Sequence, residues 1–153
     1  MQKAIFTLML IAATFITFGQ DIYKGEDGLF YGKDQQPYSG PYEEYFPDGS
    51  LQSRMTLKNG LIEGTLHIYF KNGQINEQRS FKNGEKHGLW IMWNQQGNKT
   101  GEARYTRGMK DGEWYIWNDK GVLLYDMTYK KGTREGTWKM FDNDGKLINQ
   151  KEY

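Results

Sequence analysis

The sequence predicts an all-β protein, an elongated repeat sheet of consecutive antiparallel β-hairpins with a 24-residue period. Three observations predict it: glycines recur every 24 residues, large aromatic residues recur in the same register, and the segments between them are rich in strand-forming residues. The three glycine ladders are Gly40, Gly64, Gly88, Gly112 and Gly136; Gly49, Gly73, Gly97, Gly121 and Gly145; and Gly60, Gly84, Gly108 and Gly132. Such a register over five copies indicates one structural unit repeated along the chain.

Two aromatic columns lie between the first two glycine ladders. The first column is Tyr42, Leu66, Trp90, Trp114 and Trp138, and the second is Tyr45, Tyr69, Trp93, Trp117 and Phe141. A third column is Leu57, Phe81, Tyr105, Tyr129 and Tyr153. All five tryptophans of the chain fall in the first two columns, so we expect these positions to shape the sheet.

The unit that begins at Gly112 shows how each repeat forms a hairpin. Residues 112–117 are rich in aromatic and β-branched side chains and predict a strand, while residues 118–121 (Asn-Asp-Lys-Gly) predict a turn. Residues 122–129 predict the returning strand, and residues 130–136 a link to the next hairpin. A helix is excluded, because up to three glycines in each period would cost ~1 kcal/mol apiece in its interior.

Alternation along a strand assigns the columns to faces. Residues two apart share a face, so the column of Tyr42 shares its face with the mostly apolar column of Ile68, Met92, Ile116 and Met140. The column of Tyr45 then lies on the opposite face. We expect one face to carry a continuous aromatic and aliphatic core, and the other a second, partly exposed aromatic row.

The N-terminus predicts a targeting segment. Lys3 is followed by an uncharged 15-residue run, residues 4–18, which is shorter than the ~20 residues of a membrane-spanning helix. Thr17 and Gly19 place small residues at the −3 and −1 positions of a signal-peptide cleavage site. We expect residues 1–19 to be a signal peptide and the mature protein to be exported, periplasmic or secreted; an uncleaved membrane anchor is the alternative. Residues 20–36 then form an N-terminal cap segment and residues 37–153 five repeats.

Composition excludes several functions. The chain has no cysteine and two histidines, which excludes a thiolate site and argues against a multi-histidine zinc site. The net charge of +1 gives no electrostatic basis for binding nucleic acid. No phosphate-loop or nucleophile-elbow motif is present. We therefore expect no catalytic residue, no metal site, no cofactor and no enzymatic activity.

The repeat pattern resembles that of a known family. The pattern runs Tyr105-x-x-Gly108-x-x-x-Gly112-x-Trp114-x-x-Trp117-x-x-x-Gly121, and residues 28–31 and 36–40 resemble the opening of its bacterial members. It is similar to the MORN-repeat variant family (membrane occupation and recognition nexus), whose bacterial group includes proteins labelled YwqK-type antitoxins. The resemblance covers residues 28–153 and implies a protein-binding, antitoxin-like, scaffold or phospholipid-linked role.

Three functions remain open from the sequence. The first is an exported non-catalytic module that binds a protein or an envelope component; the second is an antitoxin or immunity-like protein that neutralises a toxin; the third is an envelope lipid or glycan binder. The candidate binding surface is the second aromatic column: Tyr45, Tyr69, Trp93, Trp117 and Phe141. Residues 146–153 predict an unpaired edge strand at the end of the fifth repeat, which would pair with a second copy or with a partner strand.

Overall fold

The computed structural model describes residues 21–153; the expected signal peptide lies outside the described residues. Within residues 21–153 every regular element is a β-strand, which confirms the predicted fold class. A two-stranded hairpin, β1 (Tyr23–Lys24) and β2 (Phe30–Tyr31), precedes the repeats. The ten repeat strands are β3 (Gly40–Tyr45), β4 (Leu51–Lys58), β5 (Leu61–Tyr69), β6 (Ile75–Lys82), β7 (Glu85–Trp93), β8 (Lys99–Thr106), β9 (Met109–Trp117), β10 (Leu123–Lys130), β11 (Thr133–Phe141) and β12 (Leu147–Glu152).

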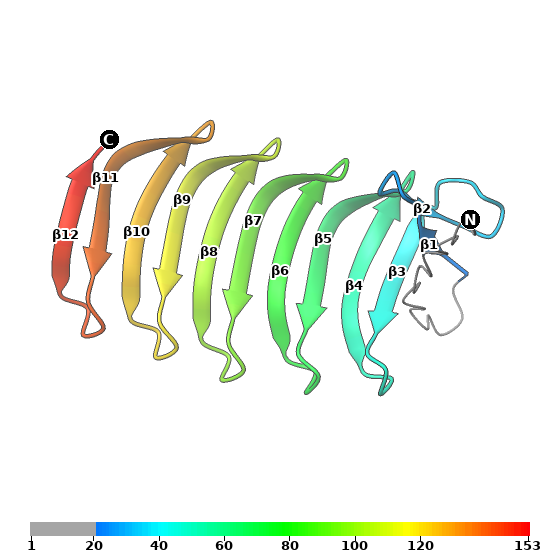
Figure 1. The fold of residues 1–153 in the computed structure, drawn as a ribbon, viewed down its shortest axis with the longest axis horizontal. Helices are drawn as coiled ribbons and strands as arrows, with labels where there is room; N and C mark the ends of the chain where they lie inside the picture. Colours follow the sequence, from blue (N-terminus) through cyan, green and yellow to red (C-terminus); the bar gives the residue numbers. More distant parts are fainter. Residues whose placement is uncertain (1–20) are drawn as a thin grey trace, which may run out of the picture.

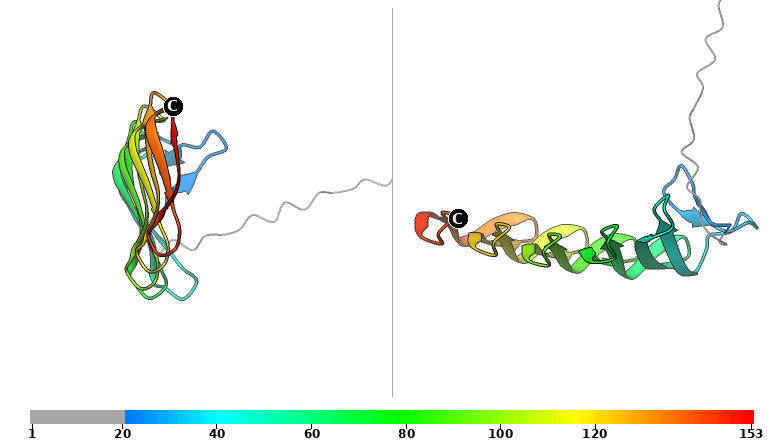
Figure 2. Two further views of the ribbon diagram at one scale, coloured as in Figure 1. Left: turned by 90° about the vertical axis from the view of Figure 1, so that its left-hand side faces the viewer. Right: turned by 90° about the horizontal axis from the view of Figure 1, so that it is seen from below.

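These ten strands form one antiparallel sheet in which each strand pairs with its neighbours in sequence (Figure 1). Seen from below, the sheet is a single elongated layer, with the N-terminal hairpin standing on one side of one end (Figure 2). Two consecutive strands make one repeat, so that β3 and β4 form repeat 1 and β11 and β12 form repeat 5. The 24-residue period is therefore the distance along the chain from one hairpin to the next.

The turns at the upper ends of the strands differ from those at the lower ends, as Figure 1 shows. Along the upper edge, successive repeats are joined by two-residue turns such as Arg107-Gly108, in which both residues have positive φ (50° and 77°). This is the geometry of a type I′ hairpin turn. Along the lower edge, the two strands of each repeat are joined by longer loops, in which Asn118 Oδ1 accepts hydrogen bonds from the N–H groups of Lys120 (3.0 Å) and Val122 (3.0 Å). This confirms the turn predicted at residues 118–121.

The predicted link at residues 130–136 is wrong, because β11 already begins at Thr133 and the connection is the short turn at Lys131 and Gly132. Gly136 lies inside β11, as Gly112 lies inside β9. Between the pairs Ala103↔Trp114 and Tyr105↔Lys110, three residues of β9 face one residue of β8, so Gly112 lies in a β-bulge. Its φ of +108° favours glycine. Gly64, Gly88 and Gly136 lie in equivalent bulges with positive φ, which accounts for these four members of the first glycine ladder.

The N-terminal hairpin covers one face of the first two repeats. Phe30 lies 5.1 Å, centroid to centroid, from the ring of Tyr42, and its N–H donates to the carbonyl of Gly60 (2.9 Å). The buried cluster there is Phe30, Tyr42, Met55, Leu57 and Leu66. Since the only other buried apolar side chain among the described residues is Met127, the best enclosed core lies beneath this cap. Repeats 3–5 keep both faces open.

Candidate binding surfaces

The face that carries Tyr42 and Leu57, here called the ladder face, holds a continuous series of aromatic rings. Successive ring centroids lie 4.8–5.5 Å apart, which is the spacing of favourable tilted and edge-to-face pairs. The rings are those of Phe81, Trp90, Tyr105, Trp114, Tyr129, Trp138 and Tyr153. The first and third sequence columns thus form one stack that runs from repeat 2 to repeat 5.

Each tryptophan of this ladder is also fixed by a hydrogen bond. The indole N–H groups of Trp90, Trp114 and Trp138 donate to the carbonyl oxygens of Ser80 (2.9 Å), Arg104 (3.1 Å) and Thr128 (2.9 Å). Each accepting carbonyl lies on the preceding strand, beside the β-bulge. Because the bulge interrupts the regular pairing there, the indole satisfies a backbone group and locks its own ring.

A column of cations borders the ladder. The Nζ of Lys110 lies 4.1 Å from the ring centroid of Trp114 and 4.5 Å from that of Tyr129. Lys86 is placed likewise over Trp90 and Tyr105, and Arg134 over Trp138 and Tyr153. Within residues 21–153 none of these three cations has an ion-pair partner. They are held by cation–π attraction and remain available to an anion.

The register explains why these charges are not neutralised on their own face. Glu102, Asp126 and Glu152 pair across the strands with Ile91, Tyr115 and Thr137, all on the opposite face. The ladder face of repeats 3–5 is therefore both aromatic and positively charged.

A groove opens in the ladder face at β8. Its floor is Gly101 and Ala103, where each of the other four repeats carries larger side chains at both positions, and its walls include Trp90 and Trp114. The cavity measures about 280 Å³. Met92, 47% exposed, lies with its methyl group against Gly101. Because methionine changes rotamer easily, the groove can widen when a ligand displaces this side chain.

The opposite face, here called the row face, carries the five residues singled out from the sequence: Tyr45, Tyr69, Trp93, Trp117 and Phe141. The pairing register and the contact of Trp117 with Tyr115 (5.6 Å between centroids) place this column on the face predicted for it. All five side chains are half-buried. Their cross-strand neighbours are Leu51, Ile75, Lys99, Leu123 and Leu147. The row is thus an apolar stripe with one cation, Lys99, in its middle.

Polar contacts fix the first member of the row. The Tyr45 hydroxyl donates to the carboxylate of Glu43, and Arg54 Nε donates to the same carboxylate over 2.7 Å. Both hydrogen bonds lower the pKa of Glu43, and the one between Tyr45 and Glu43 raises the pKa of Tyr45. On the ladder face, burial and the nearby charge of Glu44 raise the pKa of Tyr42 to about 12. These groups stabilise the sheet.

The two histidines lie apart in the fold: His67 is within β5, and His87 is near the start of β7 rather than in a linker between strands. In other repeats, the residue equivalent to His87 caps a turn with a side-chain oxygen. Glu63 accepts a hydrogen bond from the Asn83 N–H (2.6 Å), and Asp111 accepts one from the Lys131 N–H (3.3 Å). Among residues 21–153, no three His, Asp or Glu side chains lie in an arrangement that could hold a metal ion. The same stretch contains no helix of the length and apolarity that a membrane crossing requires.

The two outer edges of the sheet differ. On β3, the edge carries Pro41, which has no N–H, and the Tyr38 hydroxyl donates to the Pro41 carbonyl (3.2 Å). On β12, the Tyr153 N–H donates inward to Gly136 (3.1 Å), so by alternation the backbone of Gln150 points outward. Within the described sheet, β12 pairs only with β11.

These features define an open, single-layer β-hairpin repeat protein. Residues 38–59, 62–83, 110–131 and 134–153 match the sequence model of the family described as MORN repeat variant. The matched segments cover more than half of the chain, which therefore belongs to the MORN repeat variant family. The matched ranges leave out residues 84–109, although β7 and β8 form the same hairpin there. A comparison with curated proteins found no match.

Sequence reasoning missed the cation column. Lys86, Lys110 and Arg134 are 24 residues apart, like the glycines. Aligning charged positions on the same period would have found them. The groove at Gly101 and Ala103 was missed as well, although both are the smallest residues of their columns.

Proposed function

We propose that this protein is an exported, non-catalytic interaction module that binds a partner protein through the faces of its repeat sheet. One observation carries the proposal: the row face presents a half-buried aromatic side chain in each of the five repeats, with no second layer of the described chain over it (Figure 2). Apolar stripes of this kind, bordered by charged side chains, are typical of protein interaction sites. Export rests on the N-terminal sequence of residues 1–19.

The arrangement supports recognition of an extended surface. In an antiparallel sheet, neighbouring strands lie ~4.8 Å apart, so equivalent side chains of successive repeats lie ~10 Å apart. Five aromatic anchors at that interval can contact a flat partner, and binding energy then concentrates at the central anchors, Trp93 and Trp117.

The experiment is affinity capture from an envelope extract, followed by reconstitution of the complex from the purified protein and the captured partner. A double variant, Trp93→Gln and Trp117→Gln, should lose most of the partner while circular dichroism still shows a β-sheet. The matched control is Tyr115→Gln, which changes an aromatic residue of the same face outside the row.

Other outcomes would replace the proposal. A captured toxin whose activity the protein blocks would assign an antitoxin or immunity-like role, as in the YwqK-type group. Retention on lipid vesicles or on peptidoglycan, with no protein captured, would contradict protein binding and assign the envelope lipid or glycan role. Processing of the N-terminus in a bacterial host, read by mass spectrometry, tests export separately; an intact chain in the cytoplasm would contradict it.

A further inference from the structure

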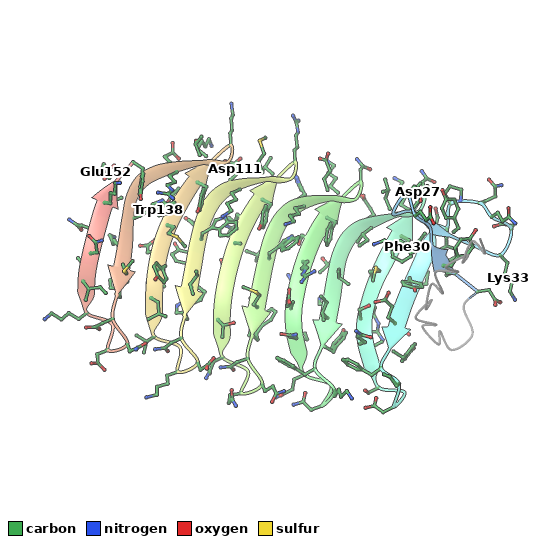
Figure 3. The ribbon with its side chains drawn as sticks, viewed as in Figure 1. Asp27, Phe30, Lys33, Asp111, Trp138 and Glu152 are labelled. Atoms are coloured by element: carbon green, nitrogen blue, oxygen red, sulfur yellow. The ribbon has the colours of Figure 1, made fainter. Side chains whose placement is uncertain are left out.

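The cap shows how this sheet receives an additional segment. On the ladder face, Phe30 packs in the cluster with Tyr42, Met55, Leu57 and Leu66, and its N–H donates to the carbonyl of Gly60. Figure 3 shows Phe30 where the cap meets the β3 end of the sheet, with Trp138 at the far end of the same sheet. Phe30 thus attaches the cap to repeat 1 through its ring and through two backbone hydrogen bonds, from its own N–H to Gly60 and from the Tyr38 N–H to its own carbonyl (2.9 Å). Ile22 of the cap packs against the same cluster.

We call the position that Phe30 occupies on repeat 1 the seat. An equivalent seat recurs 48 residues later, in repeat 3. The equivalents of Tyr42, Met55, Leu57 and Leu66 are Trp90, Ala103, Tyr105 and Trp114, and all four line the groove at β8. The equivalent of Gly60 is Gly108, which lies in the same two-residue turn. Its carbonyl accepts no hydrogen bond from residues 21–153. The groove therefore offers the walls and the backbone acceptor that hold Phe30 in repeat 1. Within the described chain no cap residue occupies it, and the Met92 methyl group lies at its Gly101 end.

Two differences define what the groove accepts. Ala103 stands where repeat 1 has Met55, so the seat is deeper by most of a methionine side chain. Tyr38 and Ile62, which flank the seat in repeat 1, are replaced by Lys86 and Lys110. At these two positions apolar side chains have become cations, which lack a carboxylate partner within the described residues. On its β6 side the groove is lined by the Glu77–Arg79 ion pair (2.7 Å), whose charges cancel.

We propose that this groove binds an extended, acidic segment of a partner protein, which seats one large apolar side chain over Ala103 between Trp90 and Trp114. Carboxylates beside that side chain face Lys86 and Lys110, and a backbone N–H of the segment donates to Gly108. The proposal rests on the proposed function, since it names the partner class and a second contact surface on the ladder face. Charge complementarity supplies its specificity, because a cationic segment would meet two unneutralised lysines.

The probe is a synthetic peptide of residues 26–38 (EDGLFYGKDQQPY), which joins the second half of the cap to the first two residues of repeat 1 and has three acidic residues, one lysine and Phe30. Its anisotropy is measured as the purified full-length protein is added. We expect saturable binding that weakens as salt rises and that disappears for a peptide with Phe30→Ser.

Two protein variants separate the contribution of the groove's volume to peptide affinity from the contribution of its charges. Ala103→Met places in repeat 3 the residue found at Met55 and Met127, so the fold should tolerate it while the groove is filled. The double variant Lys86→Glu and Lys110→Glu reverses the border. Each should weaken binding about tenfold or more, which corresponds to ~1.4 kcal/mol. The matched control, Lys58→Glu with Lys82→Glu, puts the same charge change on exposed lysines of the row face and should have little effect.

Three results would overturn the inference: no binding of the peptide, equal binding by Ala103→Met, or equal effects of the two lysine pairs. Binding to phosphatidylglycerol vesicles that depends on Lys86 and Lys110, without peptide binding, would assign these cations to a membrane surface instead. If the peptide fails but the captured partner still requires Trp93 and Trp117, the inference fails and the proposed function remains. If the peptide does not bind and partner capture does not require Trp93 and Trp117, both the inference and the proposed function are refuted.

Discussion

Replacing Trp114 by alanine should destabilise the sheet far more than replacing its neighbour Tyr115. The two residues are adjacent in β9 and point to opposite faces. Trp114 stacks between Tyr105 (5.2 Å) and Tyr129 (5.3 Å) and donates its indole N–H to Arg104. Tyr115 contacts one ring, that of Trp117, at 5.6 Å.

The magnitude follows from these contacts. Each aromatic pair contributes ~0.5–1.5 kcal/mol beyond area burial, and the indole hydrogen bond ~0.5–1.5 kcal/mol. Because Trp114 is half-buried, its truncation should fall at the lower end of the ~3–5 kcal/mol typical of a buried tryptophan. We expect a loss of about 3 kcal/mol for Trp114→Ala and about 1 kcal/mol for Tyr115→Ala. Trp114→Phe keeps a ring but loses the donor, and should cost about 1 kcal/mol.

The assay is equilibrium unfolding in urea, followed by far-ultraviolet circular dichroism because tryptophan fluorescence changes with the substitution itself. A difference of about 2 kcal/mol between the alanine variants corresponds to a midpoint difference near 1 M at m-values of ~1–3 kcal/mol/M. Equal midpoints for Trp114→Ala and Tyr115→Ala would refute the assignment of the ladder face as the structural face.

Three further predictions concern the bulge, a buried phenol and the sheet edge. Gly112→Ala should lower stability by ~1–2 kcal/mol in thermal unfolding, because its φ of +108° is strained for alanine; an unchanged melting temperature would contradict the bulge. Above pH ~10 the unfolded chain ionises its tyrosines while Tyr42, with a pKa of about 12, stays protonated. Stability therefore falls as pH rises through that range, and Tyr42→Phe should remove about 2–3 kcal/mol of the fall. If β12 pairs with a second copy, Gln150→Pro should abolish the dimer in sedimentation experiments, because it removes an N–H donor that points outward. Lys151→Pro should instead disrupt the pairing of β12 with β11. A dimer that Gln150→Pro leaves unaffected would exclude β12 as the dimer interface.

The fold was predictable because its information is local and repeated. Each hairpin carries its own turn residues and strand composition, and five copies in register reinforce one another. Alternation then placed Trp114 and Trp117 on opposite faces without knowledge of the neighbouring strands. The position of Gly112 inside β9 was not predictable in this way, since a bulge is a property of two strands and their relative register.

The candidate surfaces were predicted less completely for the same reason. The row of Tyr45, Tyr69, Trp93, Trp117 and Phe141 follows from spacing, although its role as a binding surface stays a prediction. The groove at β8 depends on three strands, whose side chains meet over Gly101 and Ala103. That the cap occupies the equivalent seat in repeat 1 depends on how a segment outside the repeats folds back, which no periodicity encodes.

A single-layer sheet uses the same residue types for stability and for binding, so composition cannot separate the two roles. The repeat itself offers a criterion. Trp90, Trp114 and Trp138 recur with the same ring neighbours and the same hydrogen bond, as a structural role requires. Ala103 and Gly101 depart from their columns at one place only, where they remove core volume and so weaken packing. Such a loss of stability in a single repeat is explained if that repeat binds a ligand. The groove in repeat 3 is also bordered by two lysines that lack an ion-pair partner among the described residues.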